Sequence, residues 1–131
     1  MSHTLTIFLV EDDARSLRAI SALLDSMNIR YRRNTSGAQV VEQIRAMRPL
    51  PDFILLNTDL PEGDAFAIYQ DIQADTRISQ IPVIALTDAN ILPELLTQIQ
   101  RHRFAGTLTK PVSQPALRQL LDTVSGIHRP R

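Results

Sequence analysis

The feature that most constrains this chain is a regular alternation of short apolar runs with longer amphipathic stretches. Three runs are continuously apolar and two further candidates are less so; in chain order the five span 5–10, 29–33, 53–56, 83–86 and 105–109. Apolar runs without polar alternation are typical of strands that are covered on both faces. The pattern therefore predicts strands in the interior of a sheet, with the two less apolar runs as further strands.

Each stretch between and after these runs has the spacing of an amphipathic helix. In the first such stretch Leu17, Ile20 and Leu24 recur at intervals of three and four residues. A helix between successive strands returns the chain to the same end of the sheet, so the strands must be parallel. We therefore expect a flavodoxin-like (βα)5 fold, which is a doubly wound five-stranded parallel sheet in a three-layer α/β sandwich.

Size and composition favour one globular domain and exclude several classes of function. A chain of 131 residues can bury a single core, and we expect a domain over 1–126 with a tail over 127–131. Fourteen basic residues balance fourteen acidic ones, which argues against direct binding of nucleic acid by bulk charge. The absence of cysteine excludes disulfides and thiolate metal sites. With no signal-peptide pattern and no apolar run near the ~20 residues that span a bilayer, we expect a cytoplasmic protein without a membrane partner. The sequence indicates no oligomeric state.

Polar side chains follow the predicted strands at the edge where ligands bind in such sheets. Glu11, Asp12 and Asp13 follow the first strand, Asn57 ends the third and Thr87 ends the fourth. Asp13 suits the N-cap of the next helix, and a cap needs only one carboxylate. The other two carboxylates are oxygen ligands of the kind that Mg²⁺ prefers.

Lys110 follows the fifth predicted strand and is the only lysine, because all thirteen other basic residues are arginine. A single lysine in such a chain indicates a specific role for an ammonium group, although codon usage alone would also explain it. With Lys110 included, two carboxylates, an amide, a hydroxyl and an ammonium are expected at one edge of the sheet.

Four segments in order resemble the receiver domain of bacterial two-component response regulators, over essentially the whole chain. They span 10–13, 55–61, 83–87 and 108–111 and read VEDD, LLNTDLP, VIALT and LTKP. The resemblance implies a phosphorelay switch in which an aspartate at the end of the third strand accepts a phosphoryl group from a histidine kinase, with Mg²⁺ neutralising the transferring oxygens.

The resemblance also assigns roles to individual residues of this chain. Asp12 would bind Mg²⁺ directly, Glu11 through water, and Asp59 through its backbone carbonyl. Lys110 and Thr87 would bind the phosphoryl group. The smaller ammonium suits that position better than a forked guanidinium.

Two positions depart from the family pattern. Asn57 stands at the phosphoacceptor position, and a neutral carboxamide is a poor nucleophile that cannot form the acyl phosphate. Its oxygen can still bind a cation, so we expect Mg²⁺ binding to be weakened. Thr107 stands where the family usually has a tyrosine or phenylalanine that moves with the Thr87 position, which puts the usual switch coupling in doubt.

Three explanations of Asn57 remain open. The chain is a natural pseudo-receiver that acts by docking without phosphorylation, or a conventional Mg²⁺-dependent receiver with an engineered Asp-to-Asn change, or a receiver whose phosphoryl group lands on Asp59 or Thr58. Thr107 favours the first, because a designed change at position 57 needs no second change at 107. The expected partner is a sensor histidine kinase or a downstream signalling protein.

Other classes of function fit less well. The chain contains no nucleophile-elbow or P-loop motif, so we expect no enzyme. A flavodoxin would need a phosphate-binding loop after the first strand, where this chain carries acidic residues that repel phosphate. Arg30, Arg32 and Arg33 indicate that the second strand lies at a sheet edge. We expect His102, near the end of the fourth helix, to be a surface residue.

Overall fold

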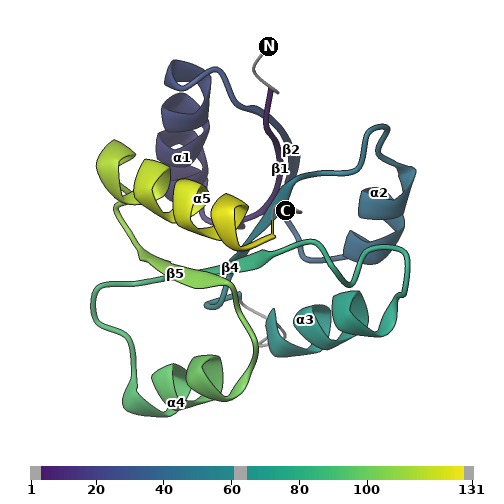
Figure 1. Cartoon of the computed structure of the whole chain (residues 1–131). Helices are drawn as coiled ribbons and strands as arrows, with labels where there is room; N and C mark the ends of the chain where they lie inside the picture. The colour runs from purple at the N-terminus through teal and green to yellow at the C-terminus, as the bar shows by residue number, and fades with distance from the viewer. Residues whose placement is uncertain (1–3, 61–64, 129–131) are drawn as a thin grey trace.

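The computed structural model describes residues 4–60 and 65–128, with the side chains of 126–128 left undescribed (Figure 1). Strands and helices alternate through these residues. In chain order the elements are β1 (Thr6–Val10), α1 (Ala14–Ser26), β2 (Arg30–Asn34), α2 (Val40–Ala46), β3 (Phe53–Asn57), α3 (Ala65–Ala74), β4 (Val83–Thr87), α4 (Pro93–Arg101), β5 (Gly106–Thr109) and α5 (Gln114–His128).

The five strands form one parallel sheet in the order β2-β1-β3-β4-β5. This order confirms the predicted flavodoxin-like doubly wound sheet, and β2 lies at an edge as its arginines indicated. The three interior strands β1, β3 and β4 are buried over almost their whole length, because helices cover both of their faces.

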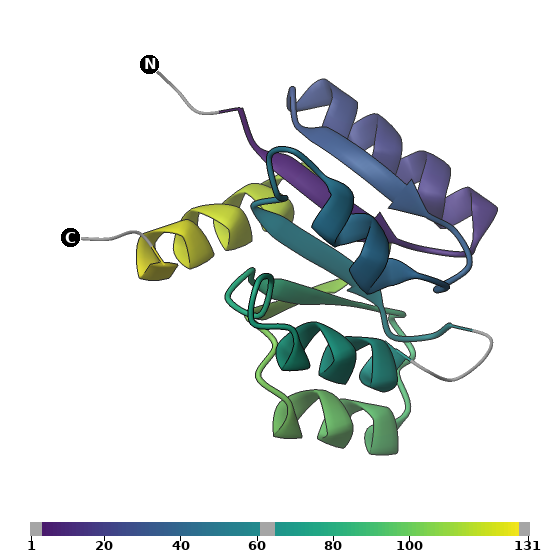
Figure 2. The same cartoon turned by 90° about the vertical axis from the view of Figure 1, so that its right-hand side faces the viewer.

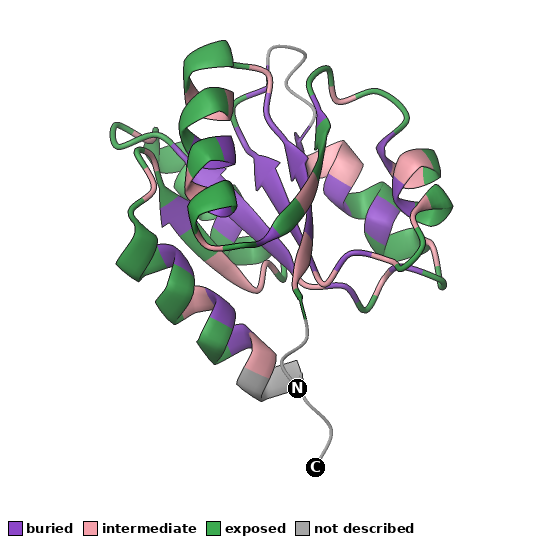
Figure 3. Cartoon of the chain, turned by 90° about the horizontal axis from the view of Figure 1, so that it is seen from above, coloured by how far each residue is buried: buried purple, intermediate pink, exposed green. Residues whose placement is uncertain are grey.

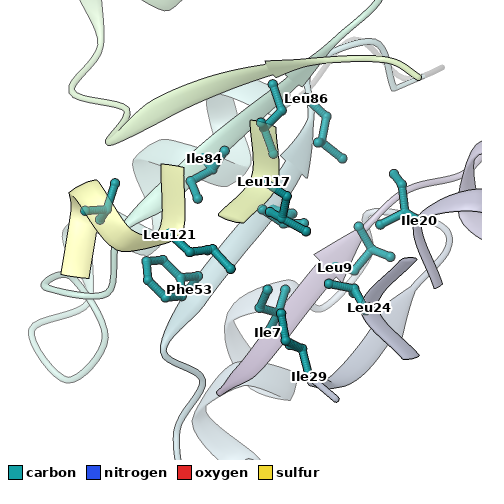
Figure 4. Packing of buried hydrophobic residues seen from close by; sticks show 13 residues of the cluster. Ile7, Leu9, Ile20, Leu24, Ile29, Phe53, Ile84, Leu86, Leu117 and Leu121 are labelled. Atoms are coloured by element: carbon teal, nitrogen blue, oxygen red, sulfur yellow. The ribbon is translucent and has the colours of Figure 1, made fainter. Parts of the chain in front are cut away.

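One face of the sheet packs against α1 and α5. Ile20 and Leu24 of α1 meet Ile7 and Leu9 of β1, and Leu117 of α5 belongs to the same cluster. Figure 4 shows these side chains pointing into a continuous apolar layer between the sheet and the two helices. The apolar stripes read from the sequence therefore become the buried faces of these helices.

The opposite face of the sheet packs against α2 and α3. Ile44 of α2 and Ile72 of α3 are fully buried against Phe8 and Ile54 of the sheet. Figure 2 shows α4 beside α3, at the far end of this layer from α2. Figure 3 shows the result of this arrangement, with buried strands at the centre and exposed outer helix faces around them.

The observed strand ends agree with the sequence pattern, whereas one helix end differs. Strand β3 ends at Asn57 and β4 at Thr87, as expected from the polar residue that follows each apolar run. Helix α5 extends to His128, past the position at which the tail was expected to begin. The domain boundary itself stays a prediction.

The parallel register brings the carboxyl ends of the strands to one edge of the sheet. Val10 of β1 pairs with Leu56, Asn57 pairs with Leu86, and Thr87 pairs with Thr109. The residues that end or follow these four strands therefore share that edge. No helix within the described residues is long and apolar enough to cross a membrane.

Candidate functional site

Asn57 lies at the centre of a polar cluster at this edge, and only 1% of its surface is exposed. Its Nδ2 group donates one hydrogen bond to Glu11 Oε2 and another to Asp12 Oδ1, each at 2.9 Å. The amide nitrogen thus bridges the two carboxylates that follow β1. Hydrogen bonds to ionised acceptors are the stronger kind, so this bridge holds β1 and β3 together at their ends.

The oxygen of the same amide is also fully used. Asn57 Oδ1 accepts from Lys110 Nζ at 3.2 Å and from the backbone N–H of Asp59 at 3.1 Å. A carboxamide has two N–H donors and two acceptor lone pairs, and here each has a partner. The side chain of Asn57 is therefore completely satisfied by the protein itself.

Glu11 and Lys110 form an ion pair inside the cluster. Lys110 Nζ lies 2.8 Å from Glu11 Oε1, and their side chains are 11% and 0% exposed. The other carboxylate oxygen of Glu11 accepts from Asn57 and, at 3.2 Å, from the backbone N–H of Asp13. Removing one member of such a pair leaves an uncompensated buried charge, which costs several kcal/mol, on the order of 3–5.

Strand pairing places Lys110 and the residues near it. The backbone N–H of Lys110 donates to the carbonyl of Thr87 at 2.8 Å, which extends the β4–β5 pairing by one step. Thr87 is buried at the end of β4. Thr58 is also buried, and its hydroxyl donates to the carbonyl of Leu86 at 2.9 Å.

Further carboxylates surround the cluster. Loss of hydration raises the pKa of Asp59, and the nearby carboxyl of Asp88 raises it further. Asp88 lies 4.0 Å from Lys110 Nζ. Asp13 caps α1 as its position suggested: its Oδ2 accepts from the backbone N–H of Ser16 at 2.8 Å, and this bond lowers the pKa of Asp13.

A family model for the response regulator receiver domain matches residues 7–122. This chain belongs to that family. The four resembling segments lie within the matched residues, and so does nearly all of the five-stranded sheet. The resemblance read from the sequence is therefore confirmed.

Known proteins similar to this receiver domain include a response regulator and histidine kinases. It is 24% identical to the polar-differentiation response regulator DivK of Brucella ovis, over 94% of this chain and 98% of DivK. It is 30% identical to the histidine kinase BarA of Escherichia coli over 89% of this chain, and it spans only 12% of BarA. Among solved structures, the receiver domain of the Pseudomonas aeruginosa sensor histidine kinase PA1611 matches with a TM-score of 0.82 and 29% identity, over 95% of this chain and 99% of that one.

The PA1611 receiver was crystallised with a magnesium ion coordinated in its active-site cleft. In the present receiver domain Glu11 and Asp12 supply two carboxylates of the type that Mg²⁺ takes, so the donor chemistry fits in part. The third side chain, Asn57, directs its N–H groups at both carboxylates and its oxygen at Lys110. Over the described residues no set of three or more His, Cys, Asp or Glu side chains is arranged to hold a metal. The assignment of Glu11, Asp12, Asn57 and Asp59 as metal ligands therefore stays a prediction.

The structure does not bring Thr107 into the cluster. Thr107 lies inside β5, pairs with Ala85 and has an exposed side chain, whereas Lys110 lies beyond the end of the same strand. Its role as a switch residue stays a prediction. The structure also shows contacts between aromatic rings of α3 and rings of the segment after α4, which the sequence did not indicate.

These contacts involve His102, which was expected at the surface. Its ring is half-buried, with its centroid 4.9 Å from Phe66 and 5.3 Å from Tyr69. Phe104 lies 4.4 Å from Tyr69 in the same group. A lone histidine at a helix end gives no sequence signal for such packing, because the contacting rings come from another helix.

Proposed function

We propose that this receiver domain works as a phosphorylation-independent docking module in two-component signal transduction. The observation that supports this proposal is the complete satisfaction of Asn57. Its amide bridges Glu11 and Asp12 and accepts from Lys110, so the cluster is held in one arrangement by hydrogen bonds within the chain. A conventional receiver must instead exchange such contacts when a phosphoryl group arrives.

The chemistry of the acceptor position also supports the proposal. The amide nitrogen of Asn57 has its lone pair delocalised into the carbonyl, and the amide oxygen is neutral. Attack on phosphorus would require that oxygen to leave Lys110 and the Asp59 N–H. We therefore propose that no stable phosphoryl adduct forms at position 57 and that the domain is not an enzyme.

We further propose that Mg²⁺ binds weakly, through Asp12, Glu11, the oxygen of Asn57 and the backbone carbonyl of Asp59. When bound, the ion would neutralise negative charge at the cluster. It would have to displace both N–H bonds of Asn57 from the carboxylates, and two carboxylates attract it less than three. Lys110 already supplies a positive charge 2.8 Å from Glu11, which opposes a further cation.

The expected partner is a sensor histidine kinase or a downstream signalling protein, contacted in the cytoplasm by protein–protein docking. Thr87 and Lys110 would respond to a phosphoryl group in a conventional receiver, but here Lys110 is bound by Glu11 and Asn57. The exposed Thr107 offers no aromatic ring to couple the cluster to the α4–β5 face. Without that coupling, docking at this face would need no signal at the cluster.

Intact-mass spectrometry after incubation with acetyl phosphate and Mg²⁺ tests the proposal, with the parent chain and Asn57→Asp measured side by side. We expect no added mass on the parent and one phosphoryl group on the variant. A phosphoryl group on the parent chain would overturn the proposal. If neither chain reacts, the cluster differs from a conventional site at more than one residue, and the docking function is strengthened.

A conventional Mg²⁺-dependent receiver carrying an Asp-to-Asn change at 57 is the second candidate. The intact Lys110–Glu11 pair beside Asn57 favours it, because these residues suit a phosphoryl site. Sequencing codon 57 of the natural gene separates the two: an asparagine codon supports the pseudo-receiver and an aspartate codon supports the second candidate.

Relocation of the phosphoryl group to a neighbouring residue has less support. The hydroxyl hydrogen of Thr58 is engaged by the Leu86 carbonyl, which leaves that oxygen poorly placed as a nucleophile. The Asp59 side chain is exposed and its carboxyl lies near that of Asp88, so the negative charge there disfavours a further anion. Peptide mapping of any phosphorylated parent chain, with Asp59→Asn as the matched variant, decides this case.

A further inference from the structure

A groove of about 530 Å³ runs between α2 and α3, on the face of the sheet that these two helices cover. Val41 and Glu42 border it on α2, and Ile68 and Asp71 border it on α3. The loop at 37–39, which leads into α2, borders one end. These lining residues are distinct from the residues of the polar cluster, so the groove is a second candidate site.

Helical spacing turns the two sides of the groove toward each other. Ile68, Asp71 and Asp75 follow at intervals of three and four residues, which places them on one face of α3 and of the turn after it. Val41 and Arg45 share a face of α2 in the same way. Arg45 Nε lies 3.7 Å from Asp75 Oδ2, so the two faces meet.

The floor of the groove is apolar. Val40 is buried, and Val41 and Ile68 are half-buried against the same core cluster. Gly37 in the loop has a φ of +82°, and a Cβ atom there would lie 3.4 Å from Ile68 Cδ1. The glycine therefore leaves the apolar surface of Ile68 open, and an apolar side chain from outside would gain free energy by covering it.

The sides of the groove carry negative charge that the chain does not neutralise. The side chains of Glu42 and Asp71 are exposed, and neither carboxylate has a hydrogen bond or ion pair within the part of the chain that the structure describes. Asp75 differs from them, because the guanidinium of Arg45 lies beside its carboxylate at the end of the groove. The two remaining carboxylates repel an anion and attract a cation.

We propose that this groove docks a basic segment of a partner protein. Arginine or lysine side chains of the segment pair with Glu42 and Asp71, and an apolar side chain between them covers Ile68. Exposed ion pairs each contribute little affinity but select the sign of the partner's charge, so the apolar contact is needed as well. The inference rests on the proposed docking function, for which it names a surface and the chemistry of the partner.

Fluorescence anisotropy with a labelled peptide of alternating arginine and leucine tests the proposal at fixed ionic strength. Peptides of the same length that alternate glutamate with leucine, or arginine with serine, separate the two kinds of contact. We expect saturable binding of the arginine–leucine peptide, clearly weaker binding of the arginine–serine peptide and none of the glutamate–leucine peptide. The double variant Glu42→Gln with Asp71→Asn should weaken binding about fivefold or more, because two exposed ion pairs are lost. Both side chains are exposed, so this variant should fold like the parent.

The double variant Glu94→Gln with Asp122→Asn is the matched control, because it removes the same charge from exposed positions on α4 and α5. We expect it to bind the peptide like the parent. Absence of saturable binding, an equal loss in the control variant, or equal binding of the arginine–serine peptide would overturn the proposal. A dimer of the parent chain that excludes the peptide and dissociates in the Glu42 and Asp71 variant would also overturn it, since a second copy would then occupy the groove.

The outcome for the groove is separate from the outcome for the proposed function. A phosphoryl group on the parent chain together with peptide binding that depends on Glu42 and Asp71 would overturn the phosphorylation-independent function and support the groove. No phosphoryl group and no peptide binding would overturn the groove and leave the proposed function to another surface.

Discussion

At the scale of single residues, Asn57 and Asn34 show the same solution to burying an amide. Asn34 ends β2, donates to the carbonyl of Ala38 and to Gln43 Oε1, and accepts from the N–H groups of Ser36 and Gly37. Both amides use every donor and acceptor, as burial requires. They differ in their partners: Asn34 contacts neutral groups, whereas Asn57 contacts two carboxylates and an ammonium.

Because the partners differ, the two asparagine-to-aspartate variants should respond differently to Mg²⁺. Asn57→Asp loses both N–H donors to Glu11 and Asp12 and adds a negative charge, so we expect a loss of about 1–3 kcal/mol in the free energy of unfolding without Mg²⁺. Mg²⁺ should restore most of that loss, because a third carboxylate completes an oxygen site. Urea denaturation of both proteins with and without Mg²⁺ measures this.

Asn34→Asp is the matched control for that experiment. It removes the donors to Ala38 and Gln43, so it should destabilise the fold by a similar amount, about 1–3 kcal/mol. The hydrogen-bond partners of Asn34 include no carboxylate, so Mg²⁺ should not restore the stability of this variant. Recovery of both variants by Mg²⁺, or of neither, would contradict the role that we assign to Asn57.

The buried phenol of Tyr69 should make the free energy of unfolding depend on pH in the alkaline range. Burial raises the pKa of Tyr69, and a backbone hydrogen bond with Arg103 lowers it by less. The folded state therefore favours the neutral phenol, and the unfolded chain ionises first. Stability should be unaffected below about pH 10, the ordinary pKa of tyrosine, and should fall as pH rises above it.

The phenolate absorbance of a Tyr31→Phe variant measures this, since the chain has two tyrosines. We expect the midpoint for Tyr69 to lie above its ordinary value in the folded protein. Tyr69→Phe should remove the alkaline loss of stability. A midpoint at or below the ordinary value would show that the ring is not held in its buried position against Phe104 and His102.

At the scale of elements, sequence patterns predict the features that follow from the order of residues along the chain, which are the strands, the helices and the sheet edge at which residues meet. Continuous apolar runs predicted β1, β3 and β4 because interior strands are covered on both faces. The same reasoning placed Asn57 and Lys110 at one edge of the sheet. In the structure Lys110 Nζ lies 3.2 Å from Asn57 Oδ1. The reasoning did not predict which way the Asn57 amide faces, because that depends on two carboxylates and an ammonium from other strands. Nor did it predict the ring packing of His102, whose contacts come from α3.

The contact between β5 and α5 predicts a steric effect at Gly106. A Cβ atom added there would lie 3.2 Å from Leu120 Cγ and closer still to its Cδ1. Gly106→Ala should therefore cost about 1–3 kcal/mol, since the helix must shift or Leu120 must change rotamer. Thermal or urea unfolding measures the loss.

The same substitution in a Leu120→Ala background is the control for this contact. There we expect Gly106→Ala to cost at least about 1 kcal/mol less than in the parent chain, because the added methyl group has room. Additive losses would mean that the effect of Gly106→Ala arises from the backbone and not from the side chain of Leu120.

At the scale of the whole molecule, stability should be unevenly distributed between the helices. Helix α1 buries Ile20, Ser21 and Leu24 against the sheet, whereas the buried part of α4 is Ile99 alone. Leu96 on α4 is 41% exposed, and Leu92, the residue before the helix, is 64% exposed. A helix with so little apolar burial gains little from packing, so it can open while the sheet and the other helices remain folded.

Hydrogen exchange measured by mass spectrometry tests this distribution. We expect the amides of α4 to exchange much faster than those of α1, at a rate that changes little when the global stability is altered. Leu24→Ala should cost about 2–5 kcal/mol and accelerate exchange throughout the protein, because Leu24 is fully buried in the main cluster. Ile99→Ala should accelerate exchange in α4 and leave α1 nearly unchanged. Equal protection of α1 and α4 would instead show that α4 unfolds only with the whole domain.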